Sequence, residues 1–433
     1  MPEKKTNIER NFFDKLRNII GYYSFYSHAL ELLFIKYLIT FTDQLNIKNI
    51  EAYKEISSFK RKNDEAKNGE YVISKDDVSE LLDSVDFLKK NSNVRLADIA
   101  DDLAFFYDKN TQKQILELLD SFVMKNEKEN IQYICDYLLA VSINDVSRTG
   151  SYVTGKVLRK ICTDLLDIKE EDTYMDCFAG YSSSLTEIKD LYNYIGYEVN
   201  KEAALISTIT CIMMGLNHFE INNADYLFET TDGRANKVLS DVIFGYKREY
   251  PDLAKKYGVN TKDVDVLSFY KSYYSASESG SVVWAVPGKF LFSSAKAYVE
   301  LRERITKGGL RAVISLPALW QGTSIGTNLI YIDKAYHGEI EFVDASKESF
   351  GEKKNYYETA NFEMLNTSNI KWAIKELWKS EGEYNSEKVE EVLAKGTWLP
   401  ERYVNTEKKN TYRSISEIDD ELSSLYEQLK ENM

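Results

Sequence analysis

The feature that most constrains the fold is a change of pattern near residue 146, where short apolar runs begin to alternate with helical periodicity. Most of the runs are continuous, as is typical of strands buried on both faces of a sheet. They cover residues 172–178, 192–199, 219–225, 237–244, 281–287, 310–317 and 329–335. Helical patterns lie between the early runs, at residues 157–166 and 201–215. This alternation predicts an α/β fold with a mainly parallel, doubly wound sheet.

The segments on either side of this region have a different character. Residues 8–43 carry apolar side chains mostly three or four positions apart, and similar spacing recurs up to about residue 145, which predicts helices. After about residue 365 the chain becomes charged and helical again, and its last apolar positions form a seam that either binds a partner helix or packs on its own domain: Ile418, Leu422, Leu425 and Leu429. We therefore expect a helical N-terminal domain (1–145), an α/β domain (146–365) and a helical C-terminal tail (366–433).

Composition narrows the classes of function. The chain has 69 acidic and 55 basic residues and a net charge of −14, which argues against a protein that binds nucleic acid alone through a broad basic face. It does not argue against a subunit whose partner supplies the cations. Three histidines and four widely spaced cysteines leave little for a metal site, so no metal is expected. The first residues lack an apolar core and no uncharged run of about 18 apolar residues occurs, so we expect a cytoplasmic protein.

Acidic residues stand at the ends of three successive predicted strands. Asp176 precedes a turn that contains Gly180, Glu198 ends the next strand 22 residues later, and Asp225 ends the third. An acid about 20 residues beyond the first turn commonly accepts hydrogen bonds from ribose hydroxyls, and a glycine lets the backbone approach a ligand. Together these residues predict a nucleoside pocket at one edge of the sheet, with adenine near Asp225. The alternative is that each acid is an ordinary turn or cap residue.

The order of segments resembles the modification (M) subunit of type I restriction-modification systems, a family of S-adenosylmethionine-dependent adenine-N6 DNA methyltransferases. RTGSYVTGKVLRKIC is similar to the family's GxxxTPxxVxxLM, and DCFAGYSS stands at its D-P-x-x-G-x-G. YIGYEVN resembles its ribose-binding strand, and KVLSDVIFGY stands at its V-L-x-N-P-P-F-G. SVVWAVPGKFLF, GGLRAVISLPALWQGTSIGTNLIYIDK and GEIEFVDASKESF follow the late part of the methylase domain. The resemblance covers nearly the whole chain.

The resemblance implies a Rossmann-like methyltransferase core that acts on an adenine flipped out of the DNA duplex. Asp241 would accept a hydrogen bond from the target amino group, Val242 would offer its backbone carbonyl, and Phe244 would stack on the base. S-adenosylmethionine would lie against the cofactor residues Thr154, Asp176, Gly180, Glu198 and Asp225. The implied partners are DNA, reached through a specificity subunit that contacts the C-terminal tail, and a second M-like subunit.

The sequence departs from the family pattern mainly where prolines are expected. D-V-I-F replaces N-P-P-F, Gly155 and Cys177 replace prolines of two earlier motifs, and Ser182 replaces a glycine. Proline presets φ and lacks an N–H, and a Cβ at a position that needs positive φ costs about 1 kcal/mol or more. Residues 237–244 are therefore either a working acceptor site or a core strand that Asp241 merely ends. Three interpretations stay open: an adenine methyltransferase subunit, a catalytically inactive scaffold that assembles with an active subunit, and a methyltransferase for small molecules or proteins.

Overall fold

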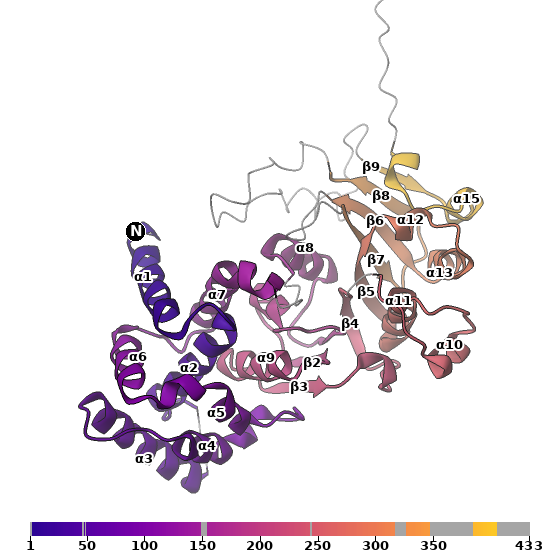
Figure 1. The fold of residues 1–433 in the computed structure, drawn as a ribbon. Helices are drawn as coiled ribbons and strands as arrows, with labels where there is room; N and C mark the ends of the chain where they lie inside the picture. Colours follow the sequence, from indigo (N-terminus) through magenta and orange to yellow (C-terminus); the bar gives the residue numbers. More distant parts are fainter. Residues whose placement is uncertain are drawn as a thin grey trace, which may run out of the picture.

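The computed structural model describes residues 2–45, 47, 49–148, 154–242, 245–316, 326–346 and 384–404. Within them lies one nine-stranded mixed sheet of order β3-β2-β1-β4-β5-β7-β6-β8-β9 (Figure 1). The strands are β1 (Thr173–Asp176), β2 (Asn193–Glu198), β3 (His218–Asn223), β4 (Ala235–Ser240), β5 (Ala276–Pro287), β6 (Leu310–Leu316), β7 (Thr327–Asp333), β8 (Ile340–Asp344) and β9 (Tyr384–Glu387). Each of the seven predicted segments overlaps one of the strands β1 to β7. The expected α/β fold is confirmed.

The order of the strands reverses beside β1, which lies between β2 and β4. Strands β3, β2, β1, β4 and β5 run parallel, and β7 lies antiparallel between β5 and β6. The chain passes from β1 outward to β2 and β3, and then returns to the other side of β1 through β4. In open α/β sheets, ligands bind at the carboxyl ends of the strands where the order reverses.

Helices cover both faces of the sheet. One face packs against α8 (Lys156–Leu166) and α9 (Lys201–Met213), in a core that continues into the N-terminal helices. The other face packs against α10 (Pro251–Tyr257), α11 (Val264–Ser275), α12 (Lys289–Phe292), α13 (Lys296–Lys307) and α15 (Val389–Lys395). Because successive strand residues point to opposite faces, Tyr174 of β1 belongs to the first core and Met175 to the second.

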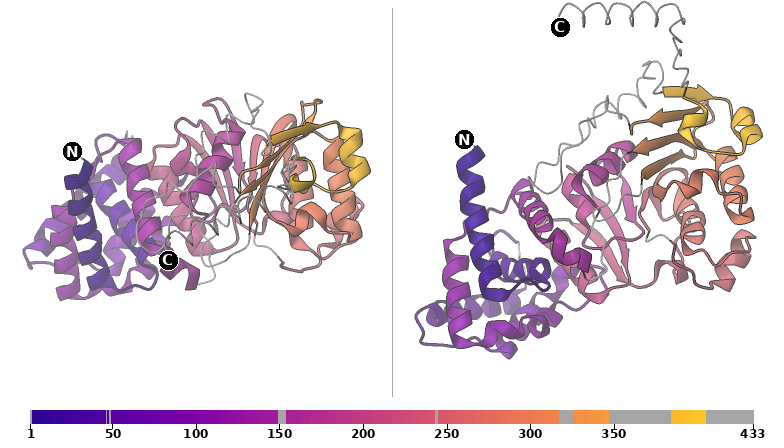
Figure 2. Two further views of the ribbon diagram at one scale, coloured as in Figure 1. Left: turned by 90° about the horizontal axis from the view of Figure 1, so that it is seen from above. Right: turned by 45° about the horizontal axis from the view of Figure 1, so that its top comes forward.

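The N-terminal domain is helical, as predicted, and lies against the β3 end of the sheet (Figures 1 and 2). Its helices are α1 (Pro2–Ile20), α2 (Phe25–Thr40), α3 (Ile50–Lys67), α4 (Lys75–Ser84), α5 (Ile99–Asp102), α6 (Lys109–Ser121) and α7 (Lys128–Arg148). Helix α2 contacts α9, where Ser27 Oγ donates to Glu202 Oε1 at 2.5 Å. At the edge of β3, Ile221 exchanges hydrogen bonds of 3.1 Å with Ser92 and Asn93. The helical domain thus covers an edge that would otherwise expose unpaired backbone groups.

Residues 384–404 belong to the α/β domain, in contrast to the predicted helical tail from residue 366. Strand β9 pairs antiparallel with β8, and Trp398, which is 1% exposed, donates from Nε1 to Thr306 Oγ1 of α13 at 3.0 Å. The segment YNSE has no apolar pattern, and it is a strand because the edge of β8 supplies its hydrogen bonds. The seam at residues 418–429 lies outside the described residues. In the described part of the chain, no helix combines the length and apolar character needed to span a membrane.

Candidate functional site

Four acidic residues lie at the carboxyl ends of neighbouring parallel strands. Asp176 and Glu198 are the last residues of β1 and β2, Asp225 follows β3 by two residues, and Asp241 directly follows β4. The register pairs Asp176 with Leu239 of β4, so that Asp241 extends beyond the edge beside it. The structure therefore brings the acids of the predicted nucleoside pocket and the predicted acceptor to one edge of the sheet.

Asp176 is a buried carboxyl at the centre of this edge. Its side chain accepts hydrogen bonds from Ser184 Oγ at 2.9 Å and from the backbone N–H of Phe178 at 3.3 Å. Burial raises the pKa of Asp176 to about 7, although both hydrogen bonds favour the ionised form. The carboxyl therefore changes its charge near neutral pH, and a cation beside it would favour ionisation.

The turn after β1 contains two residues in the left-handed backbone region. Gly180 has a φ of 52° and a Cβ at this position would meet no atom within 4 Å, so the requirement for glycine lies in the backbone and open space faces the turn. Ser182 has a φ of 54° and is fully buried. Its hydroxyl hydrogen-bonds with Tyr194 at 2.8 Å and with Ser207. The serine side chain therefore points into the domain between β2 and α9 and leaves the open side of the turn free.

Glu198 connects the turn after β1 to the start of α9. Its Oε2 accepts from the backbone N–H of Gly180 at 3.0 Å, and its Oε1 accepts from that of Asn200 at 2.7 Å. Burial raises the pKa of Glu198 despite these bonds. Each oxygen keeps one further lone pair for a ligand hydroxyl, which is the geometry expected of a ribose acceptor.

Asp225 lies in the predicted position but already has several partners. It caps the short 3₁₀ helix Tyr226–Phe228, and its Oδ2 accepts from Arg248 Nη1 at 3.2 Å and from the Tyr250 hydroxyl at 2.8 Å. The Arg248 guanidinium also lies 5.3 Å from the ring centre of Phe228, which is 63% exposed. The sequence did not predict this cluster, because Arg248 and Tyr250 follow Asp225 by 23 and 25 positions and no motif connects them to it.

Among the described residues, the hydroxyl of Thr154 donates a hydrogen bond to Asp241 Oδ2 at 2.5 Å. Although Asp241 is partly exposed, the surrounding protein removes enough water to raise the pKa of its carboxyl to about 6. The side chain of Val242 is buried in the core, and the role of its carbonyl remains a prediction. Phe244, the predicted stacking residue, lies outside the described residues. The structure thus brings together Thr154 and Asp241, which were predicted in two separate motifs.

Asp176 and Asp241 also share a neighbour, the buried thiol of Cys162 in α8. Burial raises the pKa of this thiol most, and the charges of both carboxyls raise it further. In the part of the chain that the structure describes, no lysine, arginine or histidine forms an ion pair with either carboxyl, and no group of three or more His, Cys, Asp or Glu could hold a metal ion. A positively charged group placed beside two such desolvated carboxyls would stabilise their ionised form.

The sequence profile of the N-6 DNA methylases matches residues 126–411, about two thirds of the chain. The chain belongs to the N-6 DNA methylase family. This segment of the N-6 DNA methylase contains the whole sheet and the four acids described above. A comparison with curated proteins gives no match.

Solved structures share the fold of this N-6 DNA methylase. The type I restriction-modification methyltransferase subunit from Streptococcus thermophilus has a TM-score of 0.72 at 18% identity, covering 92% of this chain and 98% of the other. A type I restriction-modification complex structure gives 0.63 at 16% identity, covering 99% and 97%. A modification subunit of a putative type I restriction enzyme from Vibrio vulnificus gives 0.55 at 14% identity, covering 71% of each chain. The predicted methyltransferase-like core with a helical N-terminal domain is confirmed.

The departures of this N-6 DNA methylase from the family motifs have local explanations in the structure. The backbone N–H of Cys177 donates to the carbonyl of Leu239 at 3.0 Å, a bond that proline could not make. Gly155, the N-cap of α8, has a φ of −61°, which proline would also adopt. Strand β4 ends at Ser240, so that Asp241 and Val242 leave the strand without the two prolines. In the described structure, the predicted nucleoside-binding acids at the ends of β1 and β2 form no ion pair, whereas Asp225 after β3 accepts a hydrogen bond from Arg248.

Proposed function

We propose that the protein is the methyltransferase subunit of a type I or related restriction-modification system, which methylates the N6 atom of adenine in DNA with S-adenosylmethionine. The observation that carries this proposal is the pair of desolvated carboxyls, Asp176 and Asp241, at adjacent strand ends with no ion pair among the described residues. A sulfonium cofactor that also carries an ammonium group has the charge that such a pair favours. Family membership supports the class of reaction, and the reversal of strand order beside β1 supports this edge of the sheet as the cofactor site.

The residues of the site would hold the cofactor as follows. Asp176 would accept from its ammonium group, the open turn at Gly180 would lie against it, and Glu198 would accept from the ribose hydroxyls. Asp225 would bind the adenine once it exchanged its hydrogen bond from Arg248. Thr154 would hold Asp241 between cofactor and base. The cofactor, when bound, supplies a methyl group already activated by the positive sulfur.

The protein's own part in the reaction is positioning. Asp241 would accept a hydrogen bond from the N6 amino group of a flipped adenine, and the Val242 carbonyl would accept the second. These acceptors direct the nitrogen lone pair toward the methyl group, and Phe244 would stack on the base. Holding two reactants in this geometry replaces an improbable encounter with a local one, which is the largest contribution that such a site can make.

The acidic total charge supports a division of labour between subunits. With a net charge of −14, the chain is poorly suited to bind the DNA phosphates alone, since non-specific affinity comes mostly from lysine and arginine. A specificity subunit would read the sequence and supply these contacts, and a second M-like subunit would complete the complex.

The proposal is tested in two steps with the full chain. Calorimetric titration with S-adenosylmethionine should show binding, and no heat at millimolar cofactor would end the proposal. Methyl transfer to duplex DNA is then measured with a co-expressed specificity subunit. Asp241→Ala should abolish transfer, whereas Asp232→Ala, which removes a half-exposed carboxylate paired with Lys256 at 2.6 Å, should not. Equal activity of the wild type and Asp241→Ala would show that Asp241 is wrongly assigned.

A catalytically inactive scaffold is the second candidate, and one observation favours it. Arg248 and Tyr250 donate hydrogen bonds to the carboxylate of Asp225, at the position where adenine would bind. If this contact persists in solution, the nucleoside pocket stays closed and the fold serves assembly. The scaffold interpretation predicts copurification with a specificity or active methyltransferase subunit and no cofactor binding, and the calorimetric titration separates it from the enzyme.

A further inference from the structure

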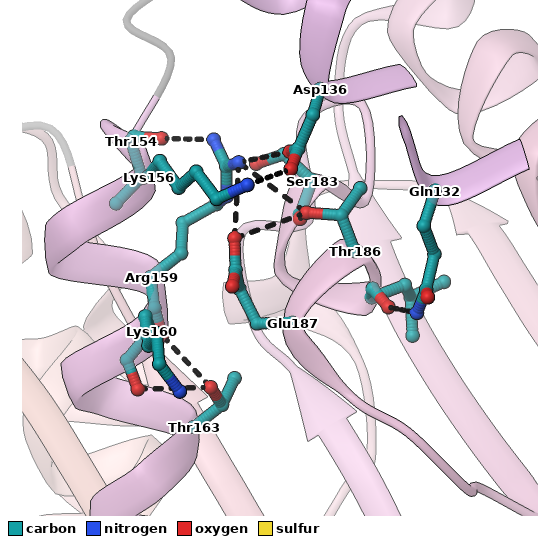
Figure 3. A network of polar contacts seen from close by, with 11 residues as sticks. Gln132, Asp136, Thr154, Lys156, Arg159, Lys160, Thr163, Ser183, Thr186 and Glu187 are labelled. Carbon is teal, nitrogen blue, oxygen red and sulfur yellow. Dashed lines mark hydrogen bonds and ion pairs between the residues drawn. The ribbon is translucent and has the colours of Figure 1, made fainter. Parts of the chain in front are cut away.

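A buried arginine connects the helical N-terminal domain to the acceptor residue. Arg159 of α8 is 3% exposed. Figure 3 shows its guanidinium between α7, the start of α8 and the segment that follows the turn after β1. Its Nη1 donates to the backbone carbonyl of Thr154 at 2.8 Å. Its Nη2 donates to Asp136 of α7 at 2.6 Å and contacts Thr186 and Glu187 at 3.3 and 3.4 Å.

The two terminal nitrogens of the guanidinium bind different parts of the protein. Nη2 is held by carboxylates of two elements, Asp136 in α7 and Glu187 in the 3₁₀ helix Ser183–Glu187, while Nη1 points to Thr154. A planar fork with donors in fixed directions can serve both sides at once, whereas the single ammonium group of lysine cannot. In addition, Gln132 of α7 donates to the carbonyls of Leu185 and Ile188. Helix α7 is therefore attached to the cofactor side of the sheet at two points.

Thr154 is held from two sides. Arg159 donates to the backbone carbonyl of Thr154, and the hydroxyl of Thr154 donates to Asp241. The next residue, Gly155, is the N-cap of α8 and has no side chain to fix the start of the helix. Arg159, one turn further along α8, folds back and donates to the carbonyl of Thr154, and it thereby fixes the residue that precedes Gly155.

We propose that Arg159 is a positioning residue: it fixes Thr154 so that the threonine hydroxyl holds Asp241 in the orientation that accepts the target amino group, and it ties this orientation to α7 of the helical domain. The proposal rests on the function proposed above, because it concerns the orientation of the same acceptor. A purely structural ion pair would be expected to affect stability alone, and buried ion pairs often contribute little even to that.

The variants separate the two roles. Arg159→Lys keeps the charge but loses the fork, and Thr154→Val removes the hydroxyl that reaches Asp241. Lys156→Met is the matched control: Lys156 pairs with the same Asp136 at 2.5 Å from the same helix, and none of its hydrogen bonds in the described structure goes to Thr154. The other titratable groups that interact with Asp241, namely Asp176 and Cys162, are unchanged in all three variants.

The first readout is the titration of Asp241, followed by ¹³C NMR of labelled aspartate carboxyls and assigned by difference with Asp241→Asn. The hydrogen bond from Thr154 lowers the pKa of Asp241 against the effect of burial. Arg159→Lys and Thr154→Val should therefore both move its titration to higher pH, the double variant should move it no further than Thr154→Val, and Lys156→Met should leave it unchanged. An unchanged titration in Arg159→Lys, or an equal shift in Lys156→Met, overturns the proposal.

The second readout is the kinetics of methyl transfer with the specificity subunit. Arg159→Lys should lower kcat by about 10- to 100-fold, as small misplacements of reacting groups do, and leave S-adenosylmethionine affinity within about twofold. If Arg159→Lys does not fold, Arg159→Met is made together with Asp136→Asn and Glu187→Gln, so that neither carboxylate is left buried without its arginine, and this triple variant is compared with Lys156→Met. The NMR titration decides the role of Arg159 and the Asp241→Ala assay decides the proposed function, so that failure of one is distinguishable from failure of the other.

Discussion

The backbone N–H of Cys177 donates to the carbonyl of Leu239 at 3.0 Å, which continues the ladder between β1 and β4 by one bond beyond Asp176. This bond occupies the position at which the family motif has a proline. Replacement of the proline by Cys177 therefore adds one hydrogen bond to the sheet, directly beside the carboxyl of Asp176. Restoring the family residue would cost stability here.

Cys177→Pro should lower the free energy of unfolding by about 1–3 kcal/mol, because the ladder bond is lost and the Leu239 carbonyl stays buried without a donor. Urea denaturation measures the change. Cys177→Ala is the control, since it removes the thiol and keeps the N–H, and the proline variant should be the less stable of the two. Equal stability of the two variants would show that this bond contributes nothing.

Gly155→Pro should have the opposite effect. The φ of Gly155 is −61°, and within the described structure no hydrogen bond is donated by its N–H. Proline at a compatible site stabilises a protein by about 0.4–1 kcal/mol because the unfolded chain loses freedom. Gly258→Ala, at a φ of 68°, should destabilise by about 1 kcal/mol or more. Thermal unfolding of both variants checks the signs, and a lower Tm for Gly155→Pro would contradict the first.

Asp176→Asn should stabilise the protein at alkaline pH. The pKa of Asp176 rises to about 7 in the folded protein, so that the folded state binds the proton more tightly than the unfolded state, and the wild type loses stability as the pH rises from about 4 to 7. The amide carries no charge and avoids this loss. Its advantage should be small at pH 4 and about 4 kcal/mol at pH 8, measured by denaturation at each pH. An advantage that does not change with pH would refute the assignment.

Cofactor binding should release protons near neutral pH. A cationic ligand stabilises the ionised carboxyls and lowers the pKa values of Asp176 and Asp241, which are raised to about 7 and about 6 in the free protein. S-adenosylmethionine affinity should therefore rise between pH 5.5 and pH 8. Calorimetry at pH 6.5 in buffers with different ionisation enthalpies counts the protons. Affinity that is independent of pH would mean that neither carboxyl meets the cation.

Arg248→Met should strengthen cofactor binding by up to about fivefold, the range of an exposed ion pair that no longer competes for Asp225. Methionine is similar in length and removes the guanidinium, which lies 5.3 and 5.2 Å from the ring centres of Phe228 and Tyr250. Lys256→Met, which breaks the surface pair with Asp232, is the control and should leave the affinity unchanged. Weaker binding in Arg248→Met would mean that Arg248 contacts the ligand itself.

Strands β1 to β7 and the acids at their ends could be predicted because both depend on local pattern. A strand buried on both faces is a continuous apolar run, and an acid that follows it lies at the carboxyl edge wherever the strand joins a parallel sheet. Strand β9 could not be predicted, because its residues YNSE carry no apolar pattern and pair only with the edge that β8 offers. The same reason explains why a helical tail was expected where residues 384–404 complete the sheet domain.

The sequence by itself determined the α/β core, the helical N-terminal domain and the strand-end positions of Asp176, Glu198, Asp225 and Asp241, since periodicity and strand order act over short stretches of chain. Tertiary structure decided which partner each of these carboxyls has. Arg248 reaches Asp225 and Thr154 reaches Asp241 across 23 and 87 positions, and Arg159 looks like any helical arginine until α7, α8 and the turn after β1 converge on it. Contacts between distant residues leave no local signal, because they exist only once the whole sheet has brought its loops together.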